Sequence, residues 1–261
     1  MDLFWIYDVS SFWSFLIVVG GFTLFSVGGI FIMKPFVSNW WSGHDNNDQI
    51  AFYLSAIGVF YGITLGLLAA GVWQNAIDSD DKVVSESSSV AALYRDASSL
   101  PNPTGKILTA KLKEFVTYII YEGWPMHKQG KVSPKGIRLL TEFQSTLYSF
   151  DPKTEREKII MAEAISQFNR TLELRQQRLS TVNNGMPAIV WATILVGGFI
   201  MIAICCMFNI PSLKLHIIFN AFIGVGIGSL IYLILMFDYP YKGSVAVSVE
   251  PYQQVYEQLM K

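Results

Sequence analysis

The fold is decided by an apolar stretch in the first third of the chain, GVFYGITLGLLAAG, which runs from Gly58 to Gly71. It is uncharged, yet it carries glycine at positions 58, 62, 66 and 71. Glycine weakens a helix in water, but small residues four apart share one helix face and let helices in lipid approach closely. The stretch therefore predicts either a face for helix packing or a helix that bends and lines a passage.

The composition of the whole chain is that of a membrane protein. Of its 261 residues, 52% are apolar and only 15% are charged, well below the roughly 25% of soluble domains. Four stretches reach the roughly 20 apolar residues that cross a bilayer: 9–33, 50–77, 187–208 and 215–237. The first has no preceding Lys or Arg and no cleavage site of a signal peptide, so we expect a retained helix. The sequence predicts an all-α integral membrane protein whose surroundings are a lipid bilayer.

The cations indicate how the chain is oriented. Nine Lys and six Arg, out of 19 cations, lie between Trp73 and Met186, whereas the other two connections contribute Lys34 and Lys214. Cytoplasmic loops carry an excess of cations, so we expect residues 78–180, both termini and the tail 238–261 on the cytoplasmic side. The net charge of −1 provides no excess of positive charge for binding nucleic acid.

Residues 78–180 are expected to form a helical domain inserted between the second and third membrane helices. No helix breaker precedes Pro101, so the second membrane helix should continue beyond residue 77. Three pairs then place a capping side chain before proline and predict three helix starts: Asn102-Pro103, Ser133-Pro134 and Asp151-Pro152. Trp124-Pro125 should end the first of these helices, and the sequence carries one strand-like stretch, GSVAVSV at 243–249.

The face of the second membrane helix opposite its glycines holds Phe60, Thr64 and Leu67, with Ile57 beside them. The sequence leaves open whether this face borders lipid, the bundle core or a pore, where a narrow apolar ring can gate ions by dewetting. The fourth membrane helix repeats the spacing of small residues with Asn220, Gly224 and Gly228, and Asn220 should bond a neighbouring helix. No Asp, Glu, Lys or Arg lies inside any span, which argues against a proton pump or a voltage sensor but not against a passive pore.

No motif for catalysis stands out, so we expect neither an enzyme nor a cofactor. Asp78, Asp80 and Asp81 could supply oxygen ligands to calcium, but they lack the spacing of a known loop, and a solvated helix face is the favoured interpretation. The histidines, at 44, 127 and 216, show no spacing of metal ligands. The adjacent Cys205 and Cys206 are expected to be packing residues.

Two segments, 44–101 and 236–255, resemble a widespread, mostly bacterial family of membrane proteins known as bestrophin-like. The first matches through Asn47, Tyr61, Gly62, Trp73, Gln74, Leu93, Tyr94, Arg95, Leu100 and Pro101. The second matches through Asp238, Pro240, Tyr241, Gly243, Val249 and Pro251. The resemblance implies structural roles for Tyr61, Trp73, Tyr94, Arg95, Asp238, Pro240, Gly243 and Pro251. For Asp238 we expect a cap on a neighbouring helix or an ion pair with a cation such as Arg95.

The resemblance also implies a function. Bestrophins are homo-oligomeric, usually pentameric ion channels whose second helix lines the pore with an apolar neck. By this likeness the chain is expected to be a passive channel in a bacterial inner membrane that conducts anions such as chloride. Ile57, Phe60, Thr64 and Leu67 would form the neck, while Gly58, Gly62 and Gly66 would pack against other helices. The calcium-binding acidic cluster of animal bestrophins has no clear counterpart here. The alternative is a non-conducting scaffold or regulator that binds a cytoplasmic partner through residues 78–180.

Overall fold

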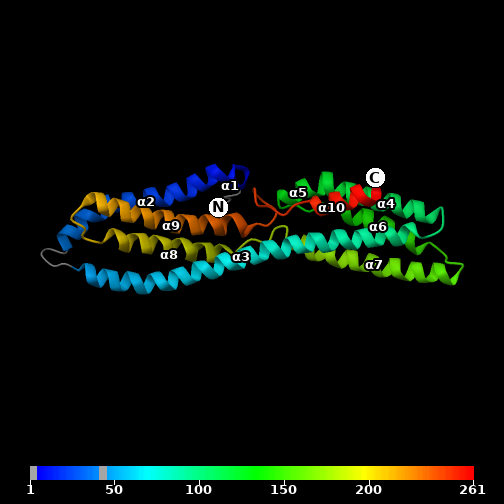
Figure 1. Cartoon of the computed structure of the whole chain (residues 1–261), viewed down its shortest axis with the longest axis horizontal. Coiled ribbons are helices and arrows are strands. Elements are labelled where there is room, and N and C mark those ends of the chain that lie inside the picture. The colour runs from blue at the N-terminus through cyan, green and yellow to red at the C-terminus, as the bar shows by residue number, and fades with distance from the viewer. Residues whose placement is uncertain (1–4, 41–45) are drawn as a thin grey trace. The chain divides into compact units, whose positions relative to one another are not determined.

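The computed structural model describes residues 5–40 and 46–261, and within these ranges the chain is helical with no strand (Figure 1). In chain order the helices are α1 (Trp5–Asp8), α2 (Ser11–Trp40), α3 (Asn47–Ser98), α4 (Thr104–Tyr118), α5 (Trp124–Lys128), α6 (Lys135–Tyr148), α7 (Glu155–Leu179), α8 (Ala188–Cys206), α9 (Leu213–Asp238) and α10 (Glu250–Val255). Two π-helical turns, Ile119–Gly123 and Tyr256–Met260, follow α4 and α10.

The chain divides into two compact units. The membrane unit comprises residues Met1–Gln74 and Gly185–Asp238, and the helical unit comprises Asn75–Asn184 and Tyr239–Lys261. Helix α3 is continuous over its 52 residues and contributes to both units, because no residue before Pro101 interrupts its backbone hydrogen bonds.

The membrane unit contains four helices that are long and apolar enough to cross a bilayer: α2 over Ser11–Val37, α3, α8 and α9. Helix α2 extends beyond the predicted residue 33, passing through Pro35 to Trp40. The core of this unit is aliphatic and includes Ile30 of α2, Leu65 of α3, Ile202 of α8 and Ile231 of α9.

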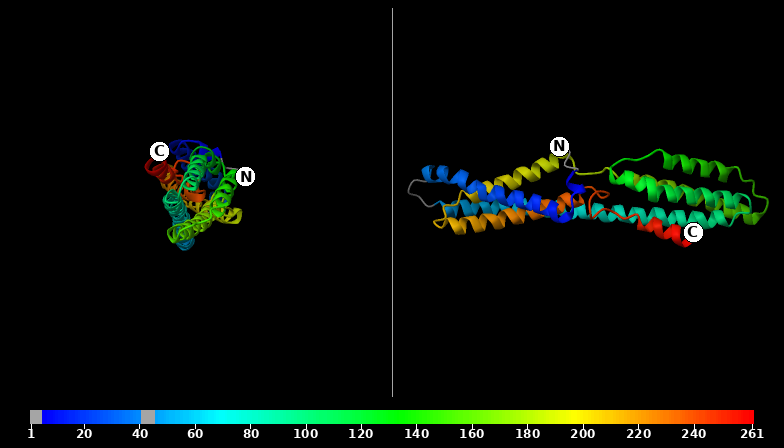
Figure 2. Two further views of the ribbon diagram at one scale, coloured as in Figure 1. Left: turned by 90° about the vertical axis from the view of Figure 1, so that its right-hand side faces the viewer. Right: turned by 90° about the horizontal axis from the view of Figure 1, so that it is seen from above.

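Helices α2 and α9 lie side by side (Figures 1 and 2) and come into tight contact at two glycines. A Cβ atom added to Gly224 would lie 2.7 Å from Cα of Thr23, and one added to Gly228 would lie 3.0 Å from Cα of Val19. Small residues at this spacing permit backbone contact between helices in lipid. Both glycines thus lie in the contact between α2 and α9.

Asn220 joins three membrane helices through its polar groups. Ser26 of α2 donates a hydrogen bond of 2.8 Å to the backbone carbonyl of Asn220 and approaches its side-chain oxygen at 3.3 Å. The thiol of Cys206, at the end of α8, lies 3.5 Å from the same side-chain oxygen. The expectation that Asn220 bonds neighbouring helices is confirmed, and Cys205 and Cys206 are both buried among packed side chains.

The helical unit has a separate core formed by α4, α6, α7, the second half of α3 and the C-terminal segment. Its fully buried apolar side chains include Leu93, Leu112, Phe143 and Phe168, and the rings of Phe143 and Phe168 stack at 5.5 Å. This core therefore gives the unit a hydrophobic centre independent of lipid.

Two of the three predicted helix starts need correction. Helix α4 begins after Pro103 with no side-chain cap from Asn102, although Ser133 does accept a hydrogen bond of 3.2 Å from the N–H of Lys135 at the start of α6. Helix α7 begins at Glu155 and not at Pro152, the residue directly after Asp151, because Thr154 and Glu157 form a capping box. Such a box satisfies two backbone N–H groups at once, which Asp151 cannot do from its position.

The prediction that Trp124-Pro125 ends a helix is wrong. The π-helical turn Ile119–Gly123 stands directly before this pair, and α5 then continues to Lys128. A proline removes one N–H and clashes with a carbonyl of the preceding turn. The wider π-helical turn changes the hydrogen-bond register there, so the chain remains helical.

The segment 238–261, expected to be a tail, is part of the core of the helical unit from Tyr239 onward. Tyr241, Tyr252 and Met260 are buried in it. The strand-like stretch 243–249 forms no strand, because its N–H groups find no partner strand; Val247 instead donates to the carbonyl of Pro240 at 2.8 Å.

Candidate functional site

One stripe of α3 packs against the other membrane helices. Leu65 and Val72 are buried, and Tyr61, Leu68 and Ala69 are partly buried against the same core. These positions recur every three or four residues and so occupy one side of the helix. Most of the other α3 surface between residues 51 and 74 is uncovered by the described chain, whereas Ile50 near the start of the helix is buried.

The predicted neck residues all lie on this uncovered surface. Phe60 is 75% exposed and Leu67 is 70% exposed, while Ile57 and Thr64 are also exposed. The hydroxyl of Thr64 donates to the carbonyl of Phe60 at 2.8 Å, so its hydrogen is used within the helix. The four side chains share one apolar helix face, and no other described element of the chain covers it.

The glycines of α3 behave differently from those of α9. A Cβ on Gly58 would meet the methyl group of Met201 at 3.3 Å, whereas a Cβ on Gly62, Gly66 or Gly71 would have no described atom within 4 Å. Gly62 and Gly66 therefore do not pack against another helix within the described chain. Their packing against another subunit stays a prediction.

Tyr61 fixes α3 against α8. Its hydroxyl donates to the carbonyl of Ile194 at 2.8 Å, and its ring lies on the adjacent Gly197 and Gly198. A Cβ on Gly197 would lie 2.5 Å from the ring, so only glycine leaves room for it. This contact sets the rotation of α3 and thereby directs Phe60 and Leu67 away from α8.

The helical unit contains a buried ionic cluster that sequence reasoning missed. Glu86 of α3 and Arg178 of α7 are fully buried, and Arg178 binds Glu86 through Nε and, at 3.5 Å, through Nη2. Burial acts against the charge of Arg178, but Glu86, together with Tyr252 and Tyr241, raises the pKa of the guanidinium. Arg175 lies one helical turn before Arg178, with its Nη1 3.7 Å from Glu86.

The surroundings of the cluster are aromatic. The guanidinium of Arg178 lies over the rings of Trp124 and Tyr252, at 5.5 and 5.9 Å from their centroids. His127 Nδ1 lies 3.1 Å from Nη1 of Arg178, so it acts as the acceptor of an Nε2-protonated ring. Burial, together with Arg178 and Arg175, lowers the pKa of His127 to about 3, so the ring is neutral near pH 7.

A signal for this cluster exists in the sequence. Ala164, Phe168 and Thr171 form the buried stripe of α7, and Arg175 and Arg178 continue it at helical spacing. Arginine in the register of a core stripe requires a buried partner. The pattern does not identify that partner, because Glu86 lies in a serine-rich run on a distant part of the chain.

The remaining candidates form no site within the described residues. Asp78, Asp80 and Asp81 are exposed on α3. No group of three or more His, Cys, Asp or Glu in the described ranges could hold a metal ion. His216 is buried beside the carbonyl of Cys205, at 3.3 Å, and His44 lies outside the described residues.

The family model described as the bestrophin-like domain matches residues 20–252. The chain belongs to the bestrophin-like family. The match begins within α2 and includes the other three long helices of the bestrophin-like membrane unit and most of its helical unit. No curated protein sequence matches this bestrophin-like chain.

Several solved structures share the fold. Two point-mutant crystal structures of a bacterial bestrophin homolog from Klebsiella pneumoniae each give a TM-score of 0.71, at 10% and 11% identity. The first covers 94% of this chain and 97% of the solved one, and the second covers 95% and 99%. A further structure of the homolog from the same organism gives 0.67 at 12% identity, with 94% and 97% covered. The bestrophin-like protein thus has the bestrophin fold.

Asp238, a residue of the bestrophin-like motif, holds the entry to α8. One of its side-chain oxygens accepts from the N–H of Met186 at 2.6 Å, and the other accepts from Nε1 of Trp191 at 3.0 Å. Of the two roles expected for Asp238, the structure has the one at the neighbouring helix terminus. The pairing of Asp238 with Arg95 stays a prediction; Arg95 belongs to the helical unit, where its side chain is exposed.

Other residues of the bestrophin-like motif occupy structural positions. Asn47 bonds the backbone N–H and carbonyl of Asn209 at 2.8 and 3.0 Å, which ties the start of α3 to the α8–α9 connection. Trp73 stacks on Phe237 with ring centroids 5.5 Å apart. Gly243 has a φ of 80°, a conformation in which a side chain is strained.

The last members of the motif lie in the helical unit. Pro251 stands in the first turn of α10, where its missing N–H costs nothing. Tyr94 packs against the core of the helical unit, and the carbonyl of Pro240 closes the turn to Val247. These contacts explain the residues as parts of the fold.

Proposed function

We propose that this bestrophin-like protein is a homo-oligomeric passive ion channel, and not an enzyme, with a pore lined by α3. The observation that carries the proposal is the uncovered surface of α3, which holds an apolar face and a stripe of small residues. We assign this surface to an ion channel because the chain belongs to the bestrophin-like family.

The small-residue stripe supports assembly with further copies of the chain. Gly62, Gly66 and Ala70 are spaced four apart and exposed. Glycine weakens a helix and gains nothing from lipid. A neighbouring helix from another subunit, packed closely on this stripe, accounts for it. Closed symmetry is the rule for homo-oligomers, and five subunits are expected from the family resemblance.

The apolar face supports a narrow neck. In a closed ring, Phe60, Thr64 and Leu67 would face the centre, with Ile57 beside them. Because Thr64 uses its hydroxyl within the helix, this face offers ions no free hydroxyl hydrogen. An apolar constriction of this kind controls ion flow by its hydration. The preference for anions such as chloride follows the family resemblance.

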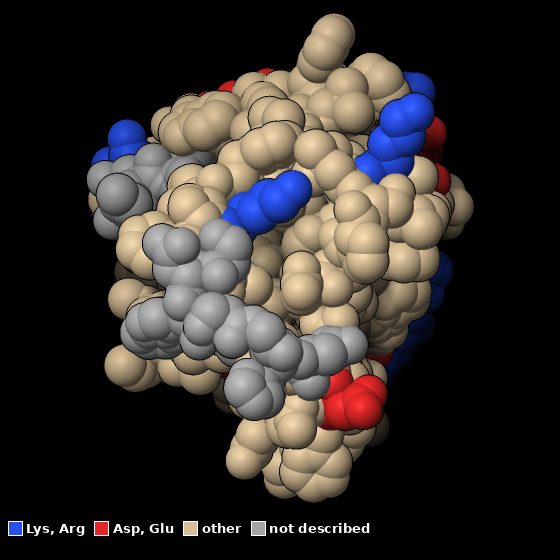
Figure 3. All heavy atoms as spheres, turned by 90° about the vertical axis from the view of Figure 1, so that its left-hand side faces the viewer, with Lys and Arg blue, Asp and Glu red and all other residues tan. Residues whose placement is uncertain are grey.

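The charge distribution supports the proposed orientation, with the helical unit and both termini on the cytoplasmic side of a bacterial inner membrane. Figure 3 views the end of the membrane unit that carries the α8–α9 connection, and mostly uncharged side chains cover this face. Of the chain's 19 cations, 15 lie between Trp73 and Met186. Cation-poor connections belong on the outer side of the membrane.

The test is flux of chloride and of potassium, measured separately, through the purified protein in liposomes. The variant Phe60→Ala/Leu67→Ala widens the proposed neck, and we expect a larger flux or a changed selectivity. Leu24→Ala/Phe222→Ala is the matched control, because it removes the same two side chains from exposed positions on α2 and α9. Equal behaviour of the two double variants would place the Phe60 face toward lipid and refute the neck.

The alternative is a scaffold or regulator that binds a cytoplasmic partner through residues 78–180. It predicts no flux from well-folded oligomers under varied pH, calcium and voltage. It also predicts that Phe60 and Thr64 tolerate substitutions that leave packing intact.

A further inference from the structure

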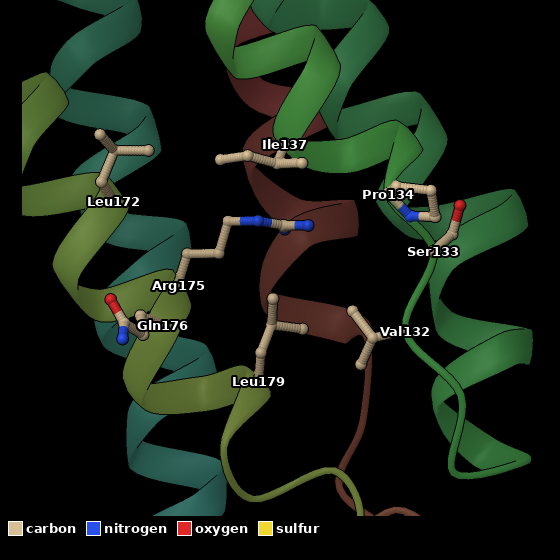
Figure 4. Close-up of a pocket in the computed structure, with 8 residues that line it drawn as sticks. All are labelled: Val132, Ser133, Pro134, Ile137, Leu172, Arg175, Gln176 and Leu179. Carbon is tan, nitrogen blue, oxygen red and sulfur yellow. The ribbon is translucent and has the colours of Figure 1, made fainter.

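A pocket of about 550 Å³ lies in the helical unit between α7 and the segment that leads into α6. Its wall is mostly aliphatic, with one cation. The lining residues, shown in Figure 4, are Val132, Ser133, Pro134, Ile137, Leu172, Arg175, Gln176 and Leu179. A mostly apolar cavity of this size with a few placed polar groups is typical of small-molecule sites.

Arg175 is the charged group of this pocket. Its side chain extends from α7 across the pocket, between Ile137 and Leu179, toward the start of α6 (Figure 4). The residue is only 4% exposed, and its Nη1, which lies 3.7 Å from the carboxylate of Glu86, has no hydrogen-bond partner among the described residues. Buried guanidinium groups are normally bound by acceptors. An unsatisfied one beside a cavity therefore indicates a missing acceptor.

The charge balance of the buried cluster also indicates that an acceptor for Arg175 is missing. Glu86 is the carboxylate of the cluster, and Arg178 already binds it through two nitrogens. Arg175 approaches Glu86 no closer than 3.7 Å, and His127 is neutral. Two buried guanidinium groups thus share one carboxylate, which leaves one positive charge uncompensated. Burying an unpaired charge is costly, and a bound anion would reduce that cost.

The position of the guanidinium is built into the fold. It lies over the ring of Phe115, 5.2 Å from the centroid. A Cβ on Gly136 would lie 2.2 Å from Nη2 of Arg175 and 2.9 Å from the ring of Tyr118. Any other residue at 136 would displace Arg175, so the glycine keeps the cation at the pocket.

We propose that this pocket binds a small amphiphilic carboxylate, whose acid group pairs with the guanidinium of Arg175. The apolar body of the ligand packs against Val132, Ile137, Leu172 and Leu179. A planar guanidinium matches a carboxylate with two parallel hydrogen bonds, and the aliphatic wall selects an acid with a hydrocarbon part over a bare inorganic anion. The proposal is independent of ion conduction, because it concerns binding to the helical unit.

The test is calorimetric titration of the full-length protein in detergent with octanoate. Octan-1-ol serves as the neutral counterpart, and chloride as the inorganic anion. Of these three compounds, we expect only octanoate to show saturable binding. Removing Arg175 leaves Glu86 and Arg178 as a balanced pair, so Arg175→Gln should fold and bind octanoate at least tenfold more weakly.

Two further variants keep the test decisive. Ile137→Trp fills the pocket from an exposed position without touching the cluster, so it should abolish binding even if Arg175→Gln misfolds. Arg170→Gln removes an exposed arginine of the same helix, paired with Glu173 at 3.1 Å, and should bind normally. No binding by the native protein, equal binding of octanol, or undiminished binding by Ile137→Trp would overturn the proposal.

Discussion

Glu86 is the counter-charge on which the core of the helical unit depends. Its carboxylate is fully buried, bound by Arg178 and 3.7 Å from Arg175. Glu86→Gln keeps the shape of the side chain but removes its charge, so two guanidinium groups remain buried with no carboxylate. Removing one partner of a buried ion pair costs about 3–5 kcal/mol. With two cations affected, we expect the upper part of that range.

The assay is thermal unfolding of the full-length protein in detergent. For a domain of this order of size, each kcal/mol shifts Tm by about 2–4 °C, so a cost of about 4–5 kcal/mol predicts a fall of about 8–20 °C. The matched control is Glu122→Gln, which removes an exposed carboxylate paired with Lys135 at 2.6 Å. Exposed pairs contribute about 0–1 kcal/mol, so this control should change Tm by only a few degrees.

A double variant separates charge from packing. Glu86→Gln/Arg178→Met leaves one buried cation in place of two, so it should recover part of the lost stability. A Glu86→Gln protein with the same Tm as the Glu122→Gln control would refute the reasoning. So would a double variant less stable than the single one, since packing and not charge would then dominate.

Three further predictions concern packing, pH and the motif acid. Gly224→Ala should destabilise the α2–α9 contact by about 1–3 kcal/mol, measured by unfolding beside Gly226→Ala, where a Cβ meets no described atom within 4 Å; equal stabilities would contradict the close approach. Because the fold lowers the pKa of His127 to about 3 from 6.5, the unfolded chain binds the proton first as the pH falls, and stability is lost below pH 6.5. From pH 7.5 to 5 this loss amounts to about 2 kcal/mol, and a His127→Gln protein with the same pH profile as the native one would disprove it. Asp238→Asn should weaken the hold on the entry to α8 by about 1–3 kcal/mol, seen as faster hydrogen exchange at Met186, whereas Asp81→Asn at an exposed position should leave that exchange unchanged.

The fold class could be predicted from the sequence because it follows from strong, local patterns. Four long apolar runs fix the membrane helices, and the absence of a breaker between Asn47 and Ser98 gives α3 its length. Asn220 could be assigned to bonds between helices because a carboxamide in an apolar span has few alternatives. Such inferences need only the chemistry of one segment.

The remainder depended on contacts between distant segments. The π-helical turn before Trp124 and the capping box at Thr154 both changed helix boundaries that proline alone predicts wrongly. The burial of Tyr252 in the helical core and the pairing of Glu86 with Arg178 join parts of the chain that no spacing connects. The pore-lining role of Phe60 stays a prediction, because its test requires the surroundings of α3 in an assembly.

The carboxamide of Asn220 has a consequence for how the membrane helices keep their alignment. Two smooth aliphatic surfaces in lipid can slide or turn past each other with little penalty, since lipid tails resemble the side chains they replace. Ser26 of α2 and Cys206 of α8 meet the same Asn220 oxygen, so a slip by one turn would strand that oxygen in hydrocarbon. One polar side chain therefore fixes the axial register of three helices, whose apolar faces alone would accept several alignments.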